Sequence, residues 1–321
     1  MRLQLKNYKS GKYVAKLVDF SKVEFNANTV LTVGSFDGVH IGHAELITAV
    51  SQKAKELGGR SVIITFDPHP REIINPTNER IYYLSTLEER TNALGEYGID
   101  ELVVIPFNRD FSLLNSAAFI ELIKKRIGIS HYVIGYDHQF GKDRSGGIQT
   151  IIDSSTNLGF TYEIIEEKQV AQAHVSSSVL RKLLLNDGNV AQAKLFLNRA
   201  YSFTGTVIHG EKRGRTIGFP TANIQLLNPK KLIPKSGVYI VDVLINEQKN
   251  RAMMNIGVKP TFGAHNQISL EVHIFDFDQK IYGYTLRIEF LARIRDEQTF
   301  SSKGALIQQL NEDKSVALSY K

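Results

Sequence analysis

The hydrophobic pattern changes character partway along the chain. In the first half, short apolar runs alternate with segments of helical spacing, as in a parallel sheet whose strands are connected by helices. After Arg199 the apolar residues recur with a period of two, which is typical of antiparallel strands. The Asp187-Gly188 pair, a helix stop signal, lies near this change. The sequence therefore predicts two domains of different class, 1–186 and 187–321.

The first domain is expected to be a doubly wound α/β fold. Its apolar runs predict parallel strands at residues 30–33, 61–66, 101–106, 132–135 and 162–165. Helical spacing predicts helices at 41–57, 86–97 and 116–127, with two more near the boundary at 177–186 and 190–197. Ser85 and Glu88 form a possible capping box for helix 86–97, and Asn115 precedes helix 116–127.

The second domain is expected to be an antiparallel barrel or sandwich. Alternating patterns separated by Gly, Pro, Asn or Asp turns predict strands at residues 201–208, 237–245, 251–257, 269–275 and 284–291. A closing amphipathic helix is expected from Ser302 to about Leu318, since apolar residues recur there at helical spacing.

Composition narrows the chemistry that the chain can use. Its 321 residues exceed the usual size of one hydrophobic core, and the absence of cysteine excludes disulfides, thiolate metal sites and cysteine nucleophiles. No apolar run reaches about 18 residues, and residues 1–16 lack the apolar middle of a signal peptide. A cytoplasmic protein without a membrane partner is therefore expected. The net charge of +6 is dispersed, and it suits polyphosphate substrates as well as nucleic acid.

A motif rich in glycine and histidine follows the first predicted strand. It consists of Gly34, Ser35, Phe36, Asp37, Gly38, Val39, His40, Ile41, Gly42 and His43. Open α/β sheets bind ligands at this end of their strands. His40 and His43 are three residues apart on one helix face, so their ring N–H groups would join backbone N–H groups pointing at an anion. Gly42 would let a nucleotide lie against the backbone. The alternative is that both histidines only cap and pack the helix.

The motif resembles the H-x-G-H nucleotidylyltransferase superfamily, and its longer form resembles the adenylyltransferase domain of prokaryotic bifunctional FAD synthetases. Segments 65–70, 135–141 and 176–181 fit that narrower family. The resemblance implies that His40 and His43 are catalytic, and that ATP phosphates are bound by Gly34, Phe36, Asp37, Gly38, Gly42, Ser177, Ser178 and Arg181. It also implies that nucleotide or flavin is bound by Asp137, Phe140 and Gly141. Simple helix capping is the alternative for the two serines.

A second phosphate motif opens the antiparallel half. A basic loop carries Gly210, Gly214 and Gly218, whose backbone N–H groups can approach phosphates. Thr221 and Asn223 follow two residues apart, so in an extended segment both side-chain oxygens face one side, toward a hard cation such as Mg²⁺. The loop alone would fit a solvated hairpin equally well.

Glu271 is the candidate base for a reaction at this loop. On its predicted strand Leu270 and Val272 take one face, which leaves Glu271 and His273 on the other. Taken alone, an outward glutamate on an antiparallel strand is most often a surface residue. His273 is expected to flank the site rather than to catalyse.

Residues 218–223, Gly-Phe-Pro-Thr-Ala-Asn, resemble riboflavin kinase. The resemblance implies that Thr221 and Asn223 carry the metal and that Glu271 accepts the proton of the ribityl 5′-hydroxyl group. It implies in addition that the loop glycines Gly210, Gly214 and Gly218 bind phosphate and that Pro220 contacts flavin or nucleotide.

The resemblance extends from about Val30 to Asp313, with the motifs in the expected order. The chain is identified by it as a member of the bifunctional riboflavin kinase/FMN adenylyltransferase (FAD synthetase) family. It implies a Rossmann-like adenylyltransferase domain followed by a six-stranded antiparallel barrel with a terminal helix. The implied reactions are ATP-dependent phosphorylation of riboflavin to FMN and adenylyl transfer to FMN, giving FAD and pyrophosphate, with Mg²⁺. Small molecules rather than nucleic acid are then the expected partners, and the oligomeric state stays open.

Two other functions compete with this one. The segment 40–43 is also a signature of class I tRNA synthetases, but the second, lysine-rich signature of those enzymes is not found in the sequence. A non-catalytic barrel that binds RNA or flavin would have no use for Glu271 or for the Thr221/Asn223 pair. Flavin products formed from ATP and riboflavin would distinguish the three.

Overall fold

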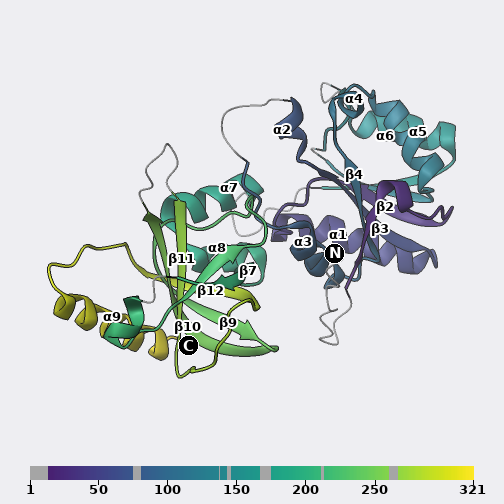
Figure 1. The fold of residues 1–321 in the computed structure, drawn as a ribbon. Coiled ribbons are helices and arrows are strands. Elements are labelled where there is room, and N and C mark those ends of the chain that lie inside the picture. The colour runs from purple at the N-terminus through teal and green to yellow at the C-terminus, as the bar shows by residue number, and fades with distance from the viewer. Residues whose placement is uncertain are drawn as a thin grey trace. The chain divides into compact units, whose positions relative to one another are not determined.

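The structure is a computed structural model that describes residues 14–74, 81–136, 138–142, 146–166, 175–210, 213–259 and 267–321 (Figure 1). Contacts divide the chain into two compact units. The first takes the described residues of Met1–Ile81 and Ser85–His174, and the second takes those of Tyr82–Leu84 and Val175–Lys321. Three residues from the first half of the chain therefore belong to the unit formed by the second half.

A six-stranded parallel sheet forms the middle layer of the first unit. Its order is β1-β4-β3-β2-β5-β6. The strands are β1 (Lys16–Asp19), β2 (Thr29–Val33), β3 (Arg60–Asp67), β4 (Glu101–Pro106), β5 (His131–Gly135) and β6 (Thr161–Ile165). Strands β3 and β4 extend the sheet on one side of β2, and β5 and β6 extend it on the other. The winding direction reverses beside β2, and the carboxyl end of a strand at such a reversal is where open α/β sheets bind ligands.

Helices cover both faces of this sheet. The helices of this unit are α1 (Ile41–Glu56), α2 (Pro70–Ile74), α3 (Leu87–Gly95), α4 (Arg109–Ser112), α5 (Ser116–Arg126) and α6 (Ile148–Leu158). Residues of α1 and α3 share a buried cluster with Ile63 of β3, whereas residues of α5 and α6 share another with Ile64. Neighbouring β3 residues thus face opposite layers, as strand alternation requires. The predicted doubly wound α/β fold is confirmed.

The elements that were not predicted in this unit carry weak sequence signals. Strand β1 has four residues and buries only Val18 among them. Helix α6 begins after Gly147 and is rich in Ser, Thr and Ile, which are modest helix formers. The predicted capping box of α3 is wrong by one residue. Thr86 is the N-cap, because its hydroxyl accepts from Glu89 N at 3.2 Å while Glu89 Oε2 accepts from Thr86 N at 3.0 Å.

The second unit is a closed antiparallel barrel of six strands, in the order β10-β11-β8-β7-β12-β9. The strands are β7 (Tyr201–Ile208), β8 (Ala222–Leu226), β9 (Gly237–Ile245), β10 (Gln248–Lys259), β11 (Gln267–Ile274) and β12 (Thr285–Arg295). Helix α9 (Lys303–Ser319) closes the chain, as predicted. Of the two predicted architectures, barrel and sandwich, the barrel is correct. Strand β8, which was not predicted as a strand, completes its closure.

The helical segment before the barrel belongs to the barrel's own core. It contains α7 (Ser177–Lys182), a π-helical turn (Leu183–Asp187) and α8 (Val190–Leu197). Leu180 and Leu184 are fully buried in the same cluster as Phe203 and Phe290 of the barrel strands. Gly188 adopts the left-handed conformation that ends the segment. The compact units divide before α7, whereas the predicted functional boundary lies at residues 186/187, so the residues that each activity needs stay a prediction.

Candidate active sites

The loop that leaves β2 has an unusual backbone. Phe36 and Val39 have φ values of 45° and 43°, and Gly38 between them has 87°. Left-handed conformations are costly for residues with a side chain and persist where the surroundings enforce them. Phe36 and Val39 are buried in the cluster under α1, which supplies that enforcement. A strained loop at the point where the sheet's winding reverses is typical of a ligand site.

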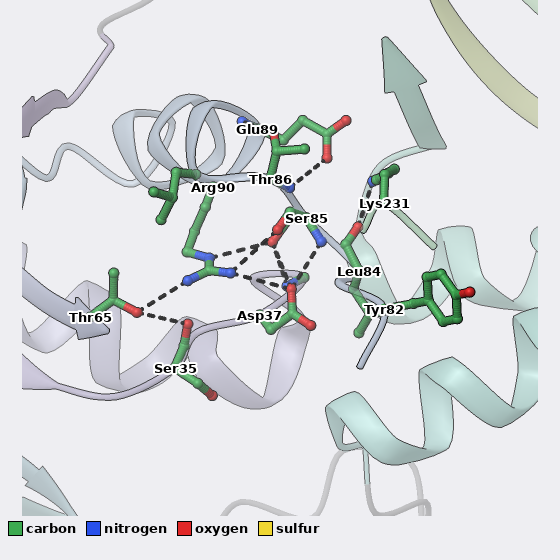
Figure 2. Close-up of polar contacts among 12 residues, drawn as sticks. Ser35, Asp37, Thr65, Tyr82, Leu84, Ser85, Thr86, Glu89, Arg90 and Lys231 are labelled. Atoms are coloured by element: carbon green, nitrogen blue, oxygen red, sulfur yellow. Dashed lines mark hydrogen bonds and ion pairs between the residues drawn. The ribbon is translucent and has the colours of Figure 1, made fainter. Parts of the chain in front are cut away.

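Asp37 is the centre of a buried polar network (Figure 2). Its side chain is 1% exposed, and Oδ1 accepts hydrogen bonds from Ser85 N at 2.9 Å and Ser85 Oγ at 3.1 Å. The guanidinium of Arg90 lies 3.4 Å from the same oxygen. Ser85 Oγ in turn accepts from Gly38 N at 2.8 Å. The carboxylate of Asp37 therefore faces groups that fix the loop, so a positioning role suits it better than the predicted contact with phosphate, which stays untested.

Arg90 ties a second point of the loop to the sheet. Its Nη1 donates to Thr65 Oγ1 at 3.1 Å, and the hydroxyl of Thr65 donates to the carbonyl of Ser35 at 3.2 Å. Arg90 is 5% exposed and Thr65 is fully buried at the end of β3. Both residues escaped the sequence analysis, because a single arginine within a helix and a single threonine within a strand give no signal of their own.

His40 and His43 lie where the loop enters α1. His40 is the N-cap residue and His43 is in the first helical turn. Their rings are stacked with centroids 3.7 Å apart, and the rings of Phe36 and His43 make an edge-type contact with centroids 5.1 Å apart. His43 Nδ1 accepts a hydrogen bond from His40 N at 3.3 Å, so a neutral His43 carries its proton on Nε2. The N-terminus of this 16-residue helix adds a partial positive charge to the same place. The structure thus brings the two predicted histidines together at the N-terminus of α1, and their contact with phosphate stays a prediction.

The other residues predicted for the first site lie in different surroundings: some are exposed and others are buried in the core. Gly34 lies beneath the Phe36 ring, where an added Cβ would be 2.8 Å from a ring carbon, and Gly42 is exposed in the first turn of α1. Phe140 is 7% exposed and packs on Phe119 in the core, and Gly141 has a φ of 74° beside Ser116. A packing role accounts for Phe140. Asp137 lies outside the described residues.

Ser177, Ser178 and Arg181 belong to α7 and so to the second unit. The N-cap is Ser176, whose Oγ accepts from Val179 N at 3.3 Å, and Ser178 is exposed on the first turn. Arg181 Nε donates to the carbonyl of Tyr82 at 3.2 Å. Ser176 therefore supplies the cap, and the contact of Ser177 and Ser178 with ATP stays a prediction.

The second site forms where β8 meets β11. Asn223 and Glu271 are paired across these strands, and Thr221 Oγ1 donates to Glu271 Oε2 at 3.4 Å. Ser269 Oγ donates to the other carboxylate oxygen at 3.1 Å. Gly210 approaches the Asn223 amide so closely that an added Cβ would meet Nδ2 at 2.0 Å. The predicted metal pair, base and one loop glycine are thus neighbours in space.

The basic loop before β8 is described in part. Gly214 lies within a 3₁₀ turn (Arg213–Ile217) and Gly218 follows it, and Phe219 N donates to the Gly214 carbonyl at 2.9 Å. Arg215 is exposed, with Nη2 3.5 Å from Tyr282 Oη. Lys212 and the side chain of Arg213 lie outside the described residues.

His273 fixes the segment that carries Thr221. Its Nδ1 lies 2.7 Å from the carbonyl of Pro220, and because a carbonyl only accepts, this nitrogen donates. His273 is 7% exposed between Phe219 and Phe275, and burial lowers its pKa. A neutral His273 therefore positions the residue before Thr221, in agreement with its predicted flanking place.

Comparisons with known proteins extend over both units. Residues 22–179 match the FAD synthetase family and residues 197–321 match the riboflavin kinase family. The bifunctional riboflavin kinase/FMN adenylyltransferase of Bacillus subtilis (strain 168) is 37% identical over 300 residues, which cover 92% of this chain and 94% of the relative. The protein of the same name from Escherichia coli (strain K12) is 33% identical over 290 residues, 90% of this chain and 91% of the relative.

A solved structure also matches nearly the whole chain. It is the crystal structure of a protein described as a macrolide-efflux protein from Streptococcus pneumoniae, with a TM-score of 0.87 and 32% identity. The match covers 95% of this chain and 99% of that one. Among the described residues of the present chain, helices are too short or too polar to cross a membrane.

Proposed function

The chain belongs to the bifunctional riboflavin kinase/FMN adenylyltransferase family, and from that premise we propose which of its residues perform each reaction. It phosphorylates riboflavin to FMN and then transfers an adenylyl group from ATP to FMN, giving FAD and pyrophosphate. One observation supports this assignment of residues to reactions. Each unit has one glycine-containing loop after a strand, and the polar side chains beside the two loops differ: His40 and His43 in the first unit, Thr221, Asn223 and Glu271 in the second. An assay that follows riboflavin, FMN and FAD together in single-residue variants tests it.

Adenylyl transfer is assigned to the loop after β2. A phosphate oxygen of FMN attacks the α-phosphorus of ATP, the bond from that phosphorus to the bridging oxygen breaks, and pyrophosphate leaves. Negative charge accumulates on the phosphates during this exchange, and preorganised donors stabilise such charge without reorganising. His43 Nε2, His40 and the N–H groups that open α1 are the donors proposed here. Asp37, Ser85 and Arg90 hold these donors in place by fixing the loop.

Phosphorylation of riboflavin is assigned to the site between β8 and β11. The oxygen of the ribityl 5′-hydroxyl group attacks the γ-phosphorus of ATP, and ADP leaves. Glu271 accepts the proton that this hydroxyl group loses. Hydrogen bonds from Thr221 and Ser269 orient the carboxylate. Phosphoryl transfer depends mainly on positioning and charge neutralisation, which the loop N–H groups near Gly210, Gly214 and Gly218 supply.

The donors beside Glu271 fit a hard divalent cation. Thr221 and Asn223 present a hydroxyl and an amide oxygen next to a carboxylate, all of which are oxygen ligands. Mg²⁺ typically takes only one or two protein ligands and completes its shell with water and substrate phosphates. When bound, the ion neutralises charge on the phosphates. We therefore propose Mg²⁺ as the metal and Thr221 and Asn223 as its protein ligands.

Loss of either metal ligand should raise the Mg²⁺ concentration that the kinase reaction needs. Thr221→Ala or Asn223→Ala removes one oxygen ligand, so Mg·ATP should bind more weakly and added Mg²⁺ should partly restore FMN formation. Titration of riboflavin phosphorylation with Mg²⁺ at fixed ATP measures this, and adenylylation of supplied FMN is the control within each variant. Unchanged Mg²⁺ dependence in both variants would remove the assignment.

The two activities are proposed to be separable, with the kinase fragment starting before α7. A fragment of residues 175–321 should convert riboflavin to FMN, whereas residues 187–321 should melt at a lower temperature. The shorter fragment lacks Leu180 and Leu184, and each fully buried leucine stabilises a fold by roughly 1.5–3 kcal/mol. Thermal unfolding and kinase assays of both fragments test this. A folded 175–321 fragment without kinase activity would contradict this separation.

The cytoplasm is proposed as the location, because both reactions consume ATP, and small-molecule substrates are proposed as the only partners. The dispersed net charge of +6 is consistent with polyphosphate binding.

A further inference from the structure

One peptide group connects the loop after β2 to a buried lysine of the barrel unit. The carbonyl oxygen of Leu84 accepts a hydrogen bond from Lys231 Nζ at 2.6 Å. The N–H of the same peptide group belongs to Ser85 and donates to Asp37 Oδ1 at 2.9 Å. Figure 2 shows the ammonium at one end of this peptide and the carboxylate at the other.

The position of Leu84 is fixed by its neighbours in the second unit. Tyr83 N donates to the carbonyl of Lys230 at 2.8 Å, and Leu232 N donates to the carbonyl of Tyr83 at 2.8 Å. The side chain of Leu84 is 2% exposed and lies in the core cluster of the barrel. Backbone pairing and packing therefore orient the carbonyl that Lys231 reaches.

Lys231 is itself an unusual residue for a structural position. It is 3% exposed, and its Nζ lies 4.4 Å from the centre of the Tyr201 ring. Tyr201 Oη donates to the carbonyl of Leu232 at 2.6 Å, which holds the ring in place. Burying an ammonium group is costly unless polar or aromatic groups replace its water, and an apolar residue would fill the same space without that cost. At this position the Leu84 carbonyl and the Tyr201 ring stabilise the ammonium, so its charge lies at the Leu84–Ser85 peptide.

Polarisation through the peptide supplies such a role. A cation at the carbonyl oxygen draws electron density toward it, so the N–H at the other end becomes a stronger donor. That donor binds the carboxylate of Asp37, which also faces Arg90. The loop ahead of His40 has positive φ values at three residues, Phe36, Gly38 and Val39, so its geometry depends on such contacts.

We propose that Lys231, which lies in the half matching the riboflavin kinase family, is a positioning residue for adenylyl transfer. It acts through the Leu84–Ser85 peptide on Asp37 and so on the loop that presents His40 and His43. The proposal rests on the assignment of adenylyl transfer to this loop.

The full-length Lys231→Met variant tests the proposal. Methionine keeps the unbranched stem in the core but donates no hydrogen bond. The kcat for FAD formation from supplied FMN should fall roughly 10-fold, with a smaller change in KM and with FMN formation from riboflavin within about twofold of the parent. Lys231→Arg should recover much of the loss, because a guanidinium can still reach the carbonyl. Lys230→Met, the same change at the exposed neighbouring position, is the matched control and should retain both activities.

A double-mutant cycle with Asp37→Ala separates transmission through the peptide from general damage. Once the acceptor for Ser85 N–H is absent, Lys231→Met should lower FAD formation by no more than about twofold further, because coupled positions are non-additive. Hydrogen exchange of the Ser85 amide gives a readout that does not depend on activity, and it should accelerate in Lys231→Met. If that variant is insoluble, Lys231→Gln, which keeps a neutral donor, takes its place with a smaller expected loss.

Three outcomes would overturn the proposal: unchanged FAD formation in Lys231→Met, equal loss of both activities, or losses that multiply in the Asp37→Ala background. The His43→Ala variant assayed in parallel distinguishes the cause. If His43→Ala loses FAD formation while Lys231→Met does not, the lysine has no positioning role. If neither loses it, the assignment of the loop itself is wrong.

Discussion

Glu271→Gln should lower the kcat for riboflavin phosphorylation about 10²-fold or more, the usual contribution of a general base. Glutamine keeps the shape of the side chain, and its one carbonyl oxygen can still accept one of the two hydrogen bonds, from Thr221 or from Ser269. It cannot take the proton of the 5′-hydroxyl group, so the loss should fall on kcat while the affinity for ATP changes little. Steady-state assays of FMN formation at varied ATP measure both quantities.

A second glutamate of the barrel provides a matched control. Glu289 on β12 is 8% exposed and bonds Lys249 at 2.8 Å, so Glu289→Gln also removes a carboxylate from a barrel strand. That variant should keep its FMN formation, and Glu271→Gln should keep adenylylation of supplied FMN. Near-normal FMN formation by Glu271→Gln would instead show that Glu271 is not the base and is an outward-facing residue without a catalytic role.

The regular elements were predictable wherever burial imposes a period on the sequence. Strand β2 has every residue buried, and β7 alternates buried residues with half-buried or exposed ones, so both stand out by pattern alone. Strand β8 did not, because Ile224 is its only buried residue and Asn223 pairs with Glu271 at the site instead of adding an apolar side chain. A site residue thus weakened the signal of the strand that carries it.

The face pattern of β11 also held only in part. Leu270, Val272 and Ile274 line the barrel interior as the alternation predicts, but Ile268, on the same face, is 50% exposed. His273, on the opposite face, is buried under Phe219 and Phe275. Alternation records which face a residue takes, whereas burial depends on what covers that face, and the covering residues come from other parts of the chain.

The candidate sites divide in the same way between local and distant residues. His40 with His43 and Thr221 with Asn223 were found because their chemistry lies within a few residues of sequence. Ser85 and Arg90 reach Asp37 from 48 and 53 residues away, and Lys231 reaches Leu84 across 147 residues. Such partners are set by the tertiary fold, and a single sequence holds no spacing rule that would reveal them.

The histidines of the first loop carry the other large expected effect. His43→Ala should lower FAD formation from supplied FMN about 10²-fold or more, the scale found for losing one preorganised donor to transition-state charge. Its Nδ1 is already engaged by the N–H of His40, so Nε2–H is the donor that the substitution removes. FMN formation from riboflavin in the same variant should stay near normal, since Glu271 and its neighbours belong to the other unit.

His40→Ala should show a loss of similar size with an added cost in stability. His40 is 4% exposed and its ring stacks on His43 at 3.7 Å, so its removal leaves a space beside the second histidine as well as removing a donor. Thermal unfolding separates the two contributions, because a folding defect lowers FMN and FAD formation together, whereas a lost donor lowers FAD formation alone. If both alanine variants fold normally and form FAD at the parental rate, the histidines only cap and pack α1, and the adenylyl group must be stabilised by the backbone of the loop.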